Sequence, residues 1–314
     1  MADREWPTVL AIVGPTAVGK SAVAVEVARA MGAEVVNADA YQVYRGLDIG
    51  TAKIRFEQRG GVPHHLLDIV GMTETLGAAD FQRRGREVLR ELARRGTGAV
   101  VVGGSGLYVR ALLDDLRFPG SDPEIRRRWE QELADVGPVR LHAVLAQRDP
   151  AAASAILSTN GRRIVRALEV GELTGQGFTA TLAASGPELI PHESIGLDLP
   201  RPALDERIAE RVDQMFAAGF VAEVRGLIHD GLREGRTASR ALGYPQVIAL
   251  IEGRLTQDEA RTEIIAATRR YARRQQRWFR RDLRTTWIDA REGLLSTVAS
   301  ILARRSAEPT TLGP

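Results

Sequence analysis

The residues best suited to chemistry lie near the N-terminus, in a glycine-rich segment that fits the pattern G-x-x-x-x-G-K-[ST]. The segment runs Gly14-Pro15-Thr16-Ala17-Val18-Gly19-Lys20-Ser21. In such a loop, successive backbone N–H groups point at one place and the following helix adds partial positive charge, so the loop binds phosphate. Lys20 is expected to reach the outer phosphates, and the Ser21 hydroxyl to stand where Mg²⁺ is held. ATP, GTP and prenyl diphosphates all carry such phosphates, so the loop alone identifies no reaction.

Two further polar side chains stand just beyond apolar runs. Asp39 follows residues 33–37, and beside bound phosphates it could hold Mg²⁺ through water or accept a proton from a nucleophile. In isolation Asp39 would be an ordinary turn residue. Ser105 follows residues 100–102, and either places a hydroxyl near a phosphate or closes a tight turn. The adjacent His64 and His65 lack a third residue at metal-ligand spacing, which favours a loop packed against the core.

The elements that must position these side chains alternate between strand and helix. Apolar runs predict buried strands at 8–13, 33–37 and 100–102, with shorter candidates at 195–199 and 286–288. Helical patterns cover 21–31, 79–95 and 204–217. This alternation predicts an α/β fold, with a P-loop NTPase-like parallel sheet flanked by helices. Ligands bind at the carboxyl ends of such strands, so one cleft could contain the glycine-rich loop, Asp39 and Ser105.

Residues 120–192 differ in character from the rest of the chain. Residues 123–133 and 162–173 are helix-like, 174–191 are rich in turn residues, and no strand is convincing. We interpret this segment as a mostly helical insertion between two parts of one core, 1–119 and 193–314, the second ending in a basic helix.

Composition narrows the class of protein. The 314 residues include no cysteine, which excludes disulfides and thiolate sites, and no apolar run approaches the ~20 residues that cross a bilayer. The N-terminus has no signal-peptide pattern, so we expect a cytoplasmic protein. The sequence leaves the oligomeric state open, and a monomer is the default expectation. Lys20 and Lys53 are the only lysines, which suggests that a compact ammonium is needed at both positions.

Net charge is only +3, yet basic residues are concentrated near the C-terminus. Between Arg269 and Arg284, eight arginines accompany a single acid, Asp282. Helical spacing predicts one stripe, with Tyr271 and Trp278 on another part of the surface. The members of the stripe are Arg270, Arg273, Arg274, Arg277, Arg281 and Arg284. Such a stripe is either a solvated helix face or a surface for nucleic-acid phosphate.

Taken together, the motifs resemble those of the bacterial tRNA dimethylallyltransferases, also called tRNA isopentenyltransferases. Residues 14–21 match the family's diphosphate loop, and residues 37–53 match its longest motif. Further blocks follow in the family's order at 63–68, 103–108, 162–170 and 241–244, and the similarity extends from about Val9 to about Trp287. The family usually has threonine where this chain has Ser105. Serine keeps the hydroxyl, so we expect its hydrogen bond to survive.

The resemblance implies transfer of a dimethylallyl group from its diphosphate to N6 of the adenosine 3′-adjacent to a tRNA anticodon. It assigns Asp39 as general base, Ser105 to the catalytic set, and Mg²⁺ as cofactor beside Ser21. An arginine on a later helix would hold the leaving diphosphate, and we place it at Arg211, with Arg207 as the competing assignment. The residues expected to contact tRNA are Asp39, Ala40, Tyr41, Gln42, Ser105, Arg126, Arg162, Arg163, Ile164, Val165, Arg166, Arg240, Gly243 and Tyr244.

Three other functions remain compatible with parts of the sequence. An adenylate prenyltransferase acting on free AMP or ADP would use the same loop, but the insertion and the arginine stripe favour tRNA. A small-molecule P-loop kinase would explain the loop and the sheet, but would need a second acidic metal ligand that residues 100–105 do not supply. A non-catalytic RNA-binding module would bind tRNA without consuming prenyl diphosphate.

Overall fold

The structure, a computed structural model, describes residues 5–178 and 185–307 and divides into two compact units. The core unit comprises the described residues of Met1–Leu113 and Ile190–Pro314, and the insertion unit those of Asp114–Leu189. Within the described ranges, no helix combines the length and the apolar character needed to cross a membrane.

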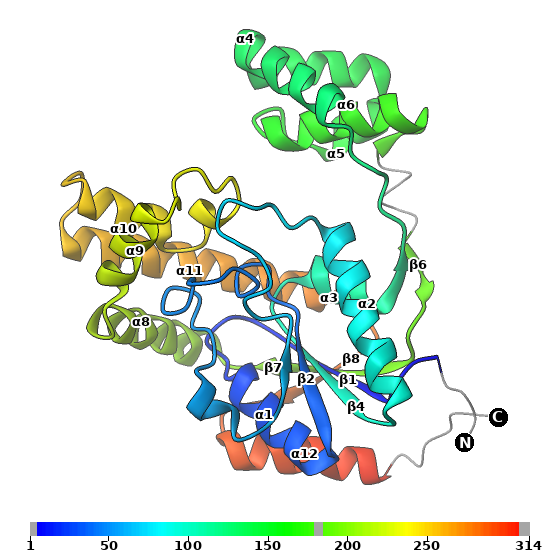
Figure 1. Cartoon of the computed structure of the whole chain (residues 1–314), viewed down its shortest axis with the longest axis vertical. Coiled ribbons are helices and arrows are strands. Elements are labelled where there is room, and N and C mark those ends of the chain that lie inside the picture. The colour runs from blue at the N-terminus through cyan, green and yellow to red at the C-terminus, as the bar shows by residue number, and fades with distance from the viewer. Residues whose placement is uncertain (1–4, 179–184, 308–314) are drawn as a thin grey trace. The chain divides into compact units, whose positions relative to one another are not determined.

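The core unit is built on a six-stranded sheet in the order β3-β2-β4-β1-β7-β8, and every pairing in it is parallel (Figure 1). The strands are β1 (Val9–Val13), β2 (Ala33–Asn37), β3 (His64–His65), β4 (Gly98–Val102), β7 (His192–Asp198) and β8 (Thr285–Asp289). All five residues of β1 are buried, as a central strand covered on both faces requires. This confirms the expected parallel α/β sheet.

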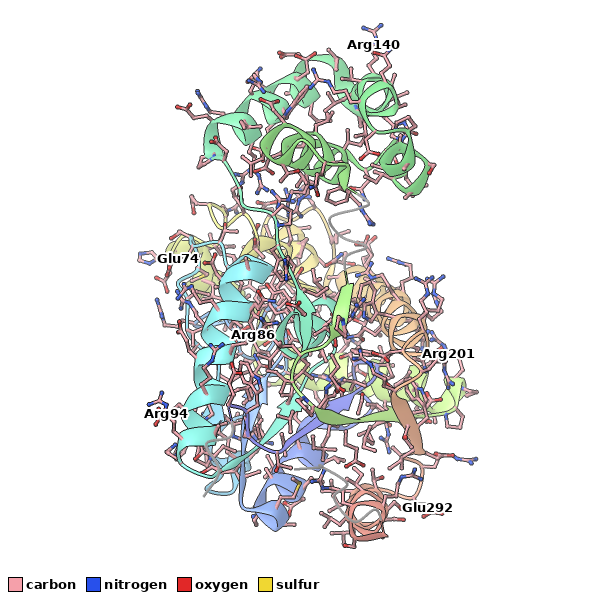
Figure 2. The ribbon with its side chains drawn as sticks, turned by 90° about the vertical axis from the view of Figure 1, so that its right-hand side faces the viewer. Glu74, Arg86, Arg94, Arg140, Arg201 and Glu292 are labelled. Carbon is pink, nitrogen blue, oxygen red and sulfur yellow. The ribbon has the colours of Figure 1, made fainter. Side chains whose placement is uncertain are left out.

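Helices cover both faces of this sheet. On one face α1 (Lys20–Met31) packs beside α12 (Leu294–Ala307), and their side chains join those of β1, β4 and β7 in one apolar cluster (Figure 1). On the other face α2 (Ala78–Arg94) packs against β4 and α3 (Gly106–Leu113). Arg86 on α2 donates to the carbonyls of Ala111 and Leu112, whereas Arg94 lies farther along the same helix (Figure 2).

The remaining elements of the core unit are helical, and all of them except the 3₁₀ turn η1 follow β7. They are α8 (Arg201–Ala217), α9 (Phe220–His229), α10 (Tyr244–Ile251), α11 (Gln257–Phe279) and the short 3₁₀ turns η1 (Phe56–Arg59) and η2 (Ala238–Arg240). Helix α11 begins with a capping box, in which the Thr256 hydroxyl accepts from the N–H of Glu259 while the Glu259 carboxylate accepts from the Thr256 N–H. The helix packs on α8, α10 and α3, so its middle reaches the carboxyl edge of the sheet.

The insertion unit is helical with one small two-stranded sheet. Its helices are α4 (Pro123–Arg148), broken at Gly137, α5 (Pro150–Ala155) and α6 (Gly161–Thr174), and its strands β5 (Asp114–Leu116) and β6 (Ser185–Glu188) pair antiparallel. The expectation of no strand in this region was therefore wrong, because β6 gains its backbone partners from a segment about 70 residues earlier that no local pattern reveals. The expected helix 123–133 was also too short.

Two other sequence predictions need correction. His64 and His65 form the edge strand β3 rather than a loop. The arginine stripe is not one helix face, because α11 ends at Phe279 and leaves Arg281 and Arg284 beyond it.

Candidate active site

The glycine-rich loop joins β1 to α1, as the sequence predicts, and its conformation depends on glycine. Gly14 has φ 137°, and a Cβ there would lie 2.6 Å from the carbonyl oxygen of Leu197 on the neighbouring strand. Gly19, at φ 104°, precedes the first residue of α1, and Ala17 also adopts a positive φ of 66°. The loop therefore aims the N-terminus of α1 into the space above the sheet, which is the arrangement that binds phosphate.

Lys20 is the first residue of α1, at the end of this loop. Its Nζ donates to the carbonyl of Pro15 at 2.7 Å, which folds the side chain back across the loop. Burial, and after it the positive charge of Arg211, lower the pKa of Lys20 to about 7, with the Asp39 charge opposing both. An anionic ligand placed beside Lys20 would favour its charged form, so the ammonium is suited to bind phosphate.

A buried glutamine, which the sequence analysis missed, ties the loop to α11. The side-chain oxygen of Gln275 accepts from the backbone N–H of Thr16 at 2.8 Å, and its Nε2 donates to the carbonyl of Gly104 at 2.9 Å. A Cβ at position 104 would lie 2.1 Å from that Nε2, so glycine is required for the approach. Gln275 shares the buried face of α11 with Ile264 and Thr268. A glutamine at a position that the helical pattern assigns to a buried face is the sequence feature that could have indicated its role.

Asp39 stands two residues beyond β2 and shapes the turn that follows it. Its Oδ1 accepts from the backbone N–H groups of Tyr41 at 2.9 Å and Gln42 at 3.4 Å. The Ser105 hydroxyl accepts from the N–H of Ala40 at 3.2 Å, so Ser105 supports the Asp39 turn from the end of β4. The carboxyl ends of β1, β2 and β4 thus bring the glycine-rich loop, Asp39 and Ser105 to one edge of the sheet, as expected.

Arg211, on α8, lies opposite Asp39. It donates to the Thr16 hydroxyl at 3.4 Å; burial lowers its pKa, and the Asp39 charge opposes that shift. Arg211 lines both of the cavities described below, while Arg207 is among the described lining residues of neither. The geometry therefore favours Arg211 as the arginine that faces the phosphate loop.

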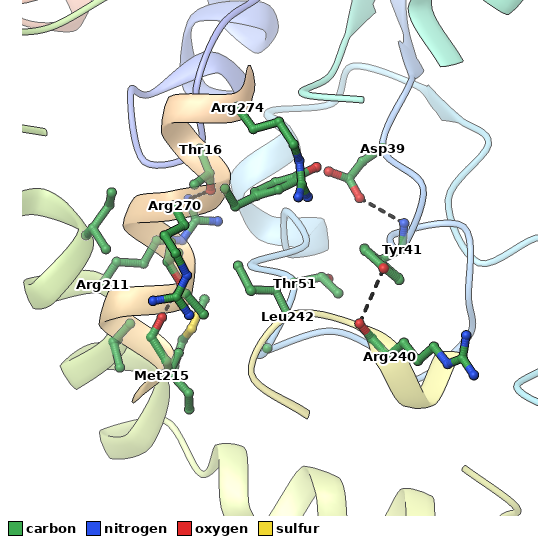
Figure 3. Close-up of a pocket in the computed structure, with 17 residues that line it drawn as sticks. Thr16, Asp39, Tyr41, Thr51, Arg211, Met215, Arg240, Leu242, Arg270 and Arg274 are labelled. Carbon is green, nitrogen blue, oxygen red and sulfur yellow. Dashed lines mark hydrogen bonds between the residues drawn. The ribbon is translucent and has the colours of Figure 1, made fainter. Parts of the chain in front are cut away.

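Two adjoining cavities meet at these residues. The first, the phosphate cavity, has a volume of about 210 Å³ and is lined by the glycine-rich loop, including Lys20 and Ser21. The second, the open cavity, has a volume of about 320 Å³ (Figure 3). Its apolar lining comes from Ile208, Val212, Met215, Leu242 and Ile264. Both cavities are lined by Thr16, Asp39, Thr51, Arg211 and Tyr271.

Helix α11 supplies a further wall of the open cavity. Arg270, Tyr271 and Arg274 all line it, and the Arg274 guanidinium lies 5.1 Å from the centre of the Tyr271 ring (Figure 3). Burial raises the pKa of the Tyr271 hydroxyl, so this group stays protonated and can donate. The expectation that Tyr271 lies apart from the arginines was wrong, since the i, i+3 spacing of Tyr271 and Arg274 places both on the cavity side.

The block at residues 240–244 contributes unevenly. Arg240 lines the open cavity, and its carbonyl accepts from the Tyr41 hydroxyl at 3.3 Å (Figure 3). Gly243 has φ 93° and packs against Phe220. The Tyr244 side chain is fully buried and donates to Glu223 at 2.7 Å, so this ring supports the site from behind rather than lining it.

In the insertion unit, Arg126 and Arg166 both bind the buried carboxylate of Glu169, at 2.7 and 2.8 Å. Burial raises the pKa of Glu169, but hydrogen bonds from these arginines and from Ser121 outweigh it and hold the pKa below its ordinary value. Ile164 and Val165 are buried in the core of the unit, whereas Arg162 and Arg163 are exposed at the start of α6. Within residues 162–166, Arg162 and Arg163 are therefore the side chains that face outward.

The oxygen ligands at the phosphate cavity are too few to hold a hard cation by themselves, but they suit one that is also bound by a substrate. Ser21 and Asp39 both line the cavity and offer oxygen ligands, which Mg²⁺ prefers. Within residues 5–178 and 185–307, no group of three or more histidine or acidic side chains stands ready to hold a metal. Such a site suits an ion that takes its other ligands from phosphate oxygens and water.

Comparison with known proteins gives consistent matches. A family model described as IPP transferase matches residues 42–282. The chain is 54% identical over 305 residues to the tRNA dimethylallyltransferase of Streptomyces avermitilis, covering 97% of both chains. It is 58% identical over 282 residues to that of Streptomyces coelicolor, covering 90% of both.

Solved structures agree with these sequence matches. The full-length tRNA isopentenylpyrophosphate transferase from Bacillus halodurans superposes with a TM-score of 0.71 at 37% identity, over 97% of this chain and 96% of that one. A eukaryotic dimethylallyltransferase described as acting on tRNA gives a TM-score of 0.83 at 25% identity, over 97% of this chain and 81% of that one.

Proposed function

The chain belongs to the IPP transferase family, and from that premise we propose that it transfers a dimethylallyl group from dimethylallyl diphosphate to N6 of the adenosine 3′-adjacent to a tRNA anticodon. The observation that carries the proposal is the junction of the two cavities, where Asp39 and Arg211 face both. A reaction that breaks the bond between an allylic carbon and its diphosphate, and joins that carbon to an acceptor nitrogen, needs such a junction, with phosphate ligands on one side and space for the acceptor on the other.

The phosphate cavity would hold the diphosphate of the donor. The backbone N–H groups of the glycine-rich loop, the Lys20 ammonium and the Arg211 guanidinium would bind its oxygens. A Mg²⁺ ion held by Ser21, with Asp39 near it, would neutralise the charge that builds up on the leaving diphosphate. The same donors stabilise that charge more in the transition state than in the ground state, which accelerates departure.

The open cavity would hold the dimethylallyl group and the acceptor base. Its apolar residues exclude water from an allylic carbon that carries positive charge, and Tyr271 offers an aromatic face beside it. The target base must leave its stack to enter, as in other enzymes that act on a base. Arg240, Arg270 and Arg274 would bind RNA phosphates at the mouth.

The chemical step is a substitution at carbon. The adenine N6 lone pair forms a bond to C1 of the allyl group as the C1–O bond breaks, and the electron pair leaves with the diphosphate. Asp39 accepts the N6 proton as general base, assistance that is typically worth about 10²–10⁴-fold in rate. With Tyr41 and Gln42 donating to its Oδ1, the Asp39 carboxylate is held in place for that role.

In the insertion unit, Arg162 and Arg163 at the start of α6 would contact the anticodon stem-loop, with Arg126 and Arg166 behind them. A tRNA substrate supports the proposal that the protein acts in the cytoplasm. We further propose that it acts as a monomer, since every group used above comes from one chain. Sedimentation of the protein alone and with tRNA would test this.

Mass spectrometry of nucleosides tests the proposed reaction directly. Unmodified tRNA incubated with the protein, Mg²⁺ and dimethylallyl diphosphate should yield N6-dimethylallyladenosine. Asp39→Ala should lower turnover by about 10²–10⁴-fold while binding of tRNA stays near that of the wild type. Product on AMP but not on tRNA would indicate an adenylate prenyltransferase instead. Unchanged turnover by Asp39→Ala would refute the general-base role.

A further inference from the structure

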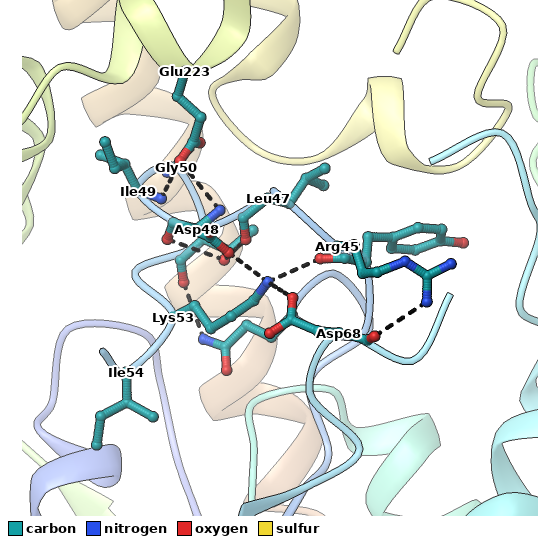
Figure 4. A network of polar contacts seen from close by, with 12 residues as sticks. Arg45, Leu47, Asp48, Ile49, Gly50, Lys53, Ile54, Asp68 and Glu223 are labelled. Carbon is teal, nitrogen blue, oxygen red and sulfur yellow. Dashed lines mark hydrogen bonds and ion pairs between the residues drawn. The ribbon is translucent and has the colours of Figure 1, made fainter. Parts of the chain in front are cut away.

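The loop at residues 48–53, here called the wall loop, forms part of both cavities. None of its side chains has a role in the reaction proposed above. Gly50 and Thr51 line the open cavity, and Thr51 and Ala52 line the phosphate cavity. Its shape is held by a network of polar contacts from two sides (Figure 4). The two charged groups that anchor the network are Glu223 and Lys53.

Glu223, on α9, binds the start of the wall loop through three consecutive backbone N–H groups. Its Oε2 accepts from Asp48 at 3.2 Å and Ile49 at 2.6 Å, and its Oε1 accepts from Gly50 at 3.2 Å (Figure 4). The hydroxyl of the buried Tyr244 donates to the same Oε1 at 2.7 Å. A carboxylate is required here, because all four partners are donors and a carboxylate offers only acceptors.

Lys53 anchors the other end of the wall loop. Its side chain is 4% exposed, and its Nζ donates to the carbonyl of Tyr44 at 2.8 Å, to Asp48 at 2.6 Å and to Asp68 at 2.5 Å (Figure 4). Three acceptors match the three N–H donors of an ammonium, whereas a planar guanidinium cannot meet three acceptors that converge on one point. This explains a lysine at position 53 in a chain whose basic residues, apart from Lys20 and Lys53, are arginine or histidine.

The backbone of the wall loop is tightly packed and strained. A Cβ at Gly50 would lie 2.3 Å from the Phe220 ring and 2.6 Å from the Tyr244 ring. Ala52 adopts φ 49°, a left-handed conformation that a non-glycine residue keeps only when its surroundings impose it. The bonds of Glu223 and Lys53 fix the backbone on either side of Ala52.

The wall loop is in turn connected to the Asp39 turn. The Gln42 side chain donates to the carbonyl of Thr51 at 3.1 Å, and the Gln42 backbone N–H donates to the Asp39 carboxylate. A shift of the wall loop would therefore move Gln42, and with it the turn that orients Asp39.

From these contacts we propose that Glu223 is a positioning residue for the reaction, which acts through the wall loop and Gln42 on the Asp39 carboxylate. This proposal rests on the proposed function, which assigns Asp39 as the general base. Glu223 touches no substrate in this scheme; it sets where the general base points.

The first test compares Glu223→Gln with Glu193→Gln in prenylation of an anticodon stem-loop RNA. Glu193 is a matched control, because its carboxylate binds Arg305 at 2.7 Å and lines neither cavity among the described residues. We expect Glu223→Gln to lower kcat by about 10–100-fold, the effect of a small misplacement of a catalytic group, with the KM for dimethylallyl diphosphate within about twofold of wild type. Glu193→Gln should leave kcat unchanged. Equal kcat losses in the two variants would overturn the proposal.

A double-mutant cycle tests the route through Gln42. If Glu223 acts through Gln42, the double variant Glu223→Gln with Gln42→Ala should have a kcat no lower than that of whichever single variant has the lower kcat. A kcat loss equal to the product of the two single losses would overturn the proposal.

Hydrogen exchange supplies a readout that needs no turnover. Glu223→Gln should speed amide exchange at residues 48–50 and also at Tyr41 and Gln42, whereas Glu193→Gln should change neither segment. Faster exchange at 48–50 alone would refute the connection to Asp39. Wild-type protein that leaves every RNA unmodified would refute the proposed function only, since the exchange result is independent of it.

Discussion

Replacing Gln275 by leucine should loosen the glycine-rich loop without changing any residue of that loop. The variant keeps the volume of the side chain but removes the acceptor for the Thr16 N–H and the donor to the Gly104 carbonyl. A backbone group left unpaired in the interior costs about 1–3 kcal/mol, so the two together should cost about 3 kcal/mol. At about 2–4 °C per kcal/mol for a domain of this size, the Tm should fall by about 6–12 °C.

The loss should also appear in binding. The Thr16 N–H is part of the glycine-rich loop. Without its bond to Gln275 the loop is less ordered, and the free energy of ordering it reduces the affinity for diphosphate. We expect the Kd for inorganic diphosphate with Mg²⁺ to rise about tenfold, which corresponds to about 1.4 kcal/mol. Calorimetry measures the Kd, and differential scanning fluorimetry measures the Tm.

Gln276→Leu is the matched control, because Gln276 is the next residue on α11 and its side-chain bond among the described residues is to Asp198 at 2.9 Å. It should lower the Tm by less than half as much and leave diphosphate affinity unchanged. Equal Tm values and equal affinities for the two variants would refute the view that Gln275 organises the loop.

Two further outcomes follow from the charged groups. Arg211→Met should lower kcat by about 10²-fold or more, measured as prenylated RNA at saturating substrate. Arg207→Met should have a kcat near that of the wild type. A larger loss of kcat in Arg207→Met than in Arg211→Met would assign the diphosphate contact to Arg207. Glu169→Gln should destabilise the insertion unit by about 3 kcal/mol at pH 7, since it leaves Arg126 and Arg166 without their carboxylate. The folded-state pKa of Glu169 lies below its ordinary 4.5, so the stability that its ionised form adds is present above pH 4.5 and lost as pH falls below it. The gap between the wild-type and variant urea midpoints should therefore narrow below pH 4.5, and a gap that stays constant with pH would contradict this.

The sequence by itself determined the parts of the site that depend on neighbours along the chain. The glycine-rich loop could be predicted because Gly14 and Gly19 need backbone conformations that other residues rarely adopt, and because an apolar run and a helical pattern flank them. The places of Asp39 and Ser105 could be predicted for a related reason, since parallel strands carry their carboxyl ends to one edge.

Only the tertiary structure decided which later residues join them. Gln275 meets Thr16 across 259 residues, and Glu223 meets Ile49 across 174. Neither glutamine nor glutamate belongs to a local motif, and the direction in which each points depends on how α11 and α9 pack. The same is true of Tyr271, which the helical pattern placed away from the arginines. Helix packing is decided by side chains distant in sequence, so spacing along one helix cannot reveal which of its faces meets the cavity.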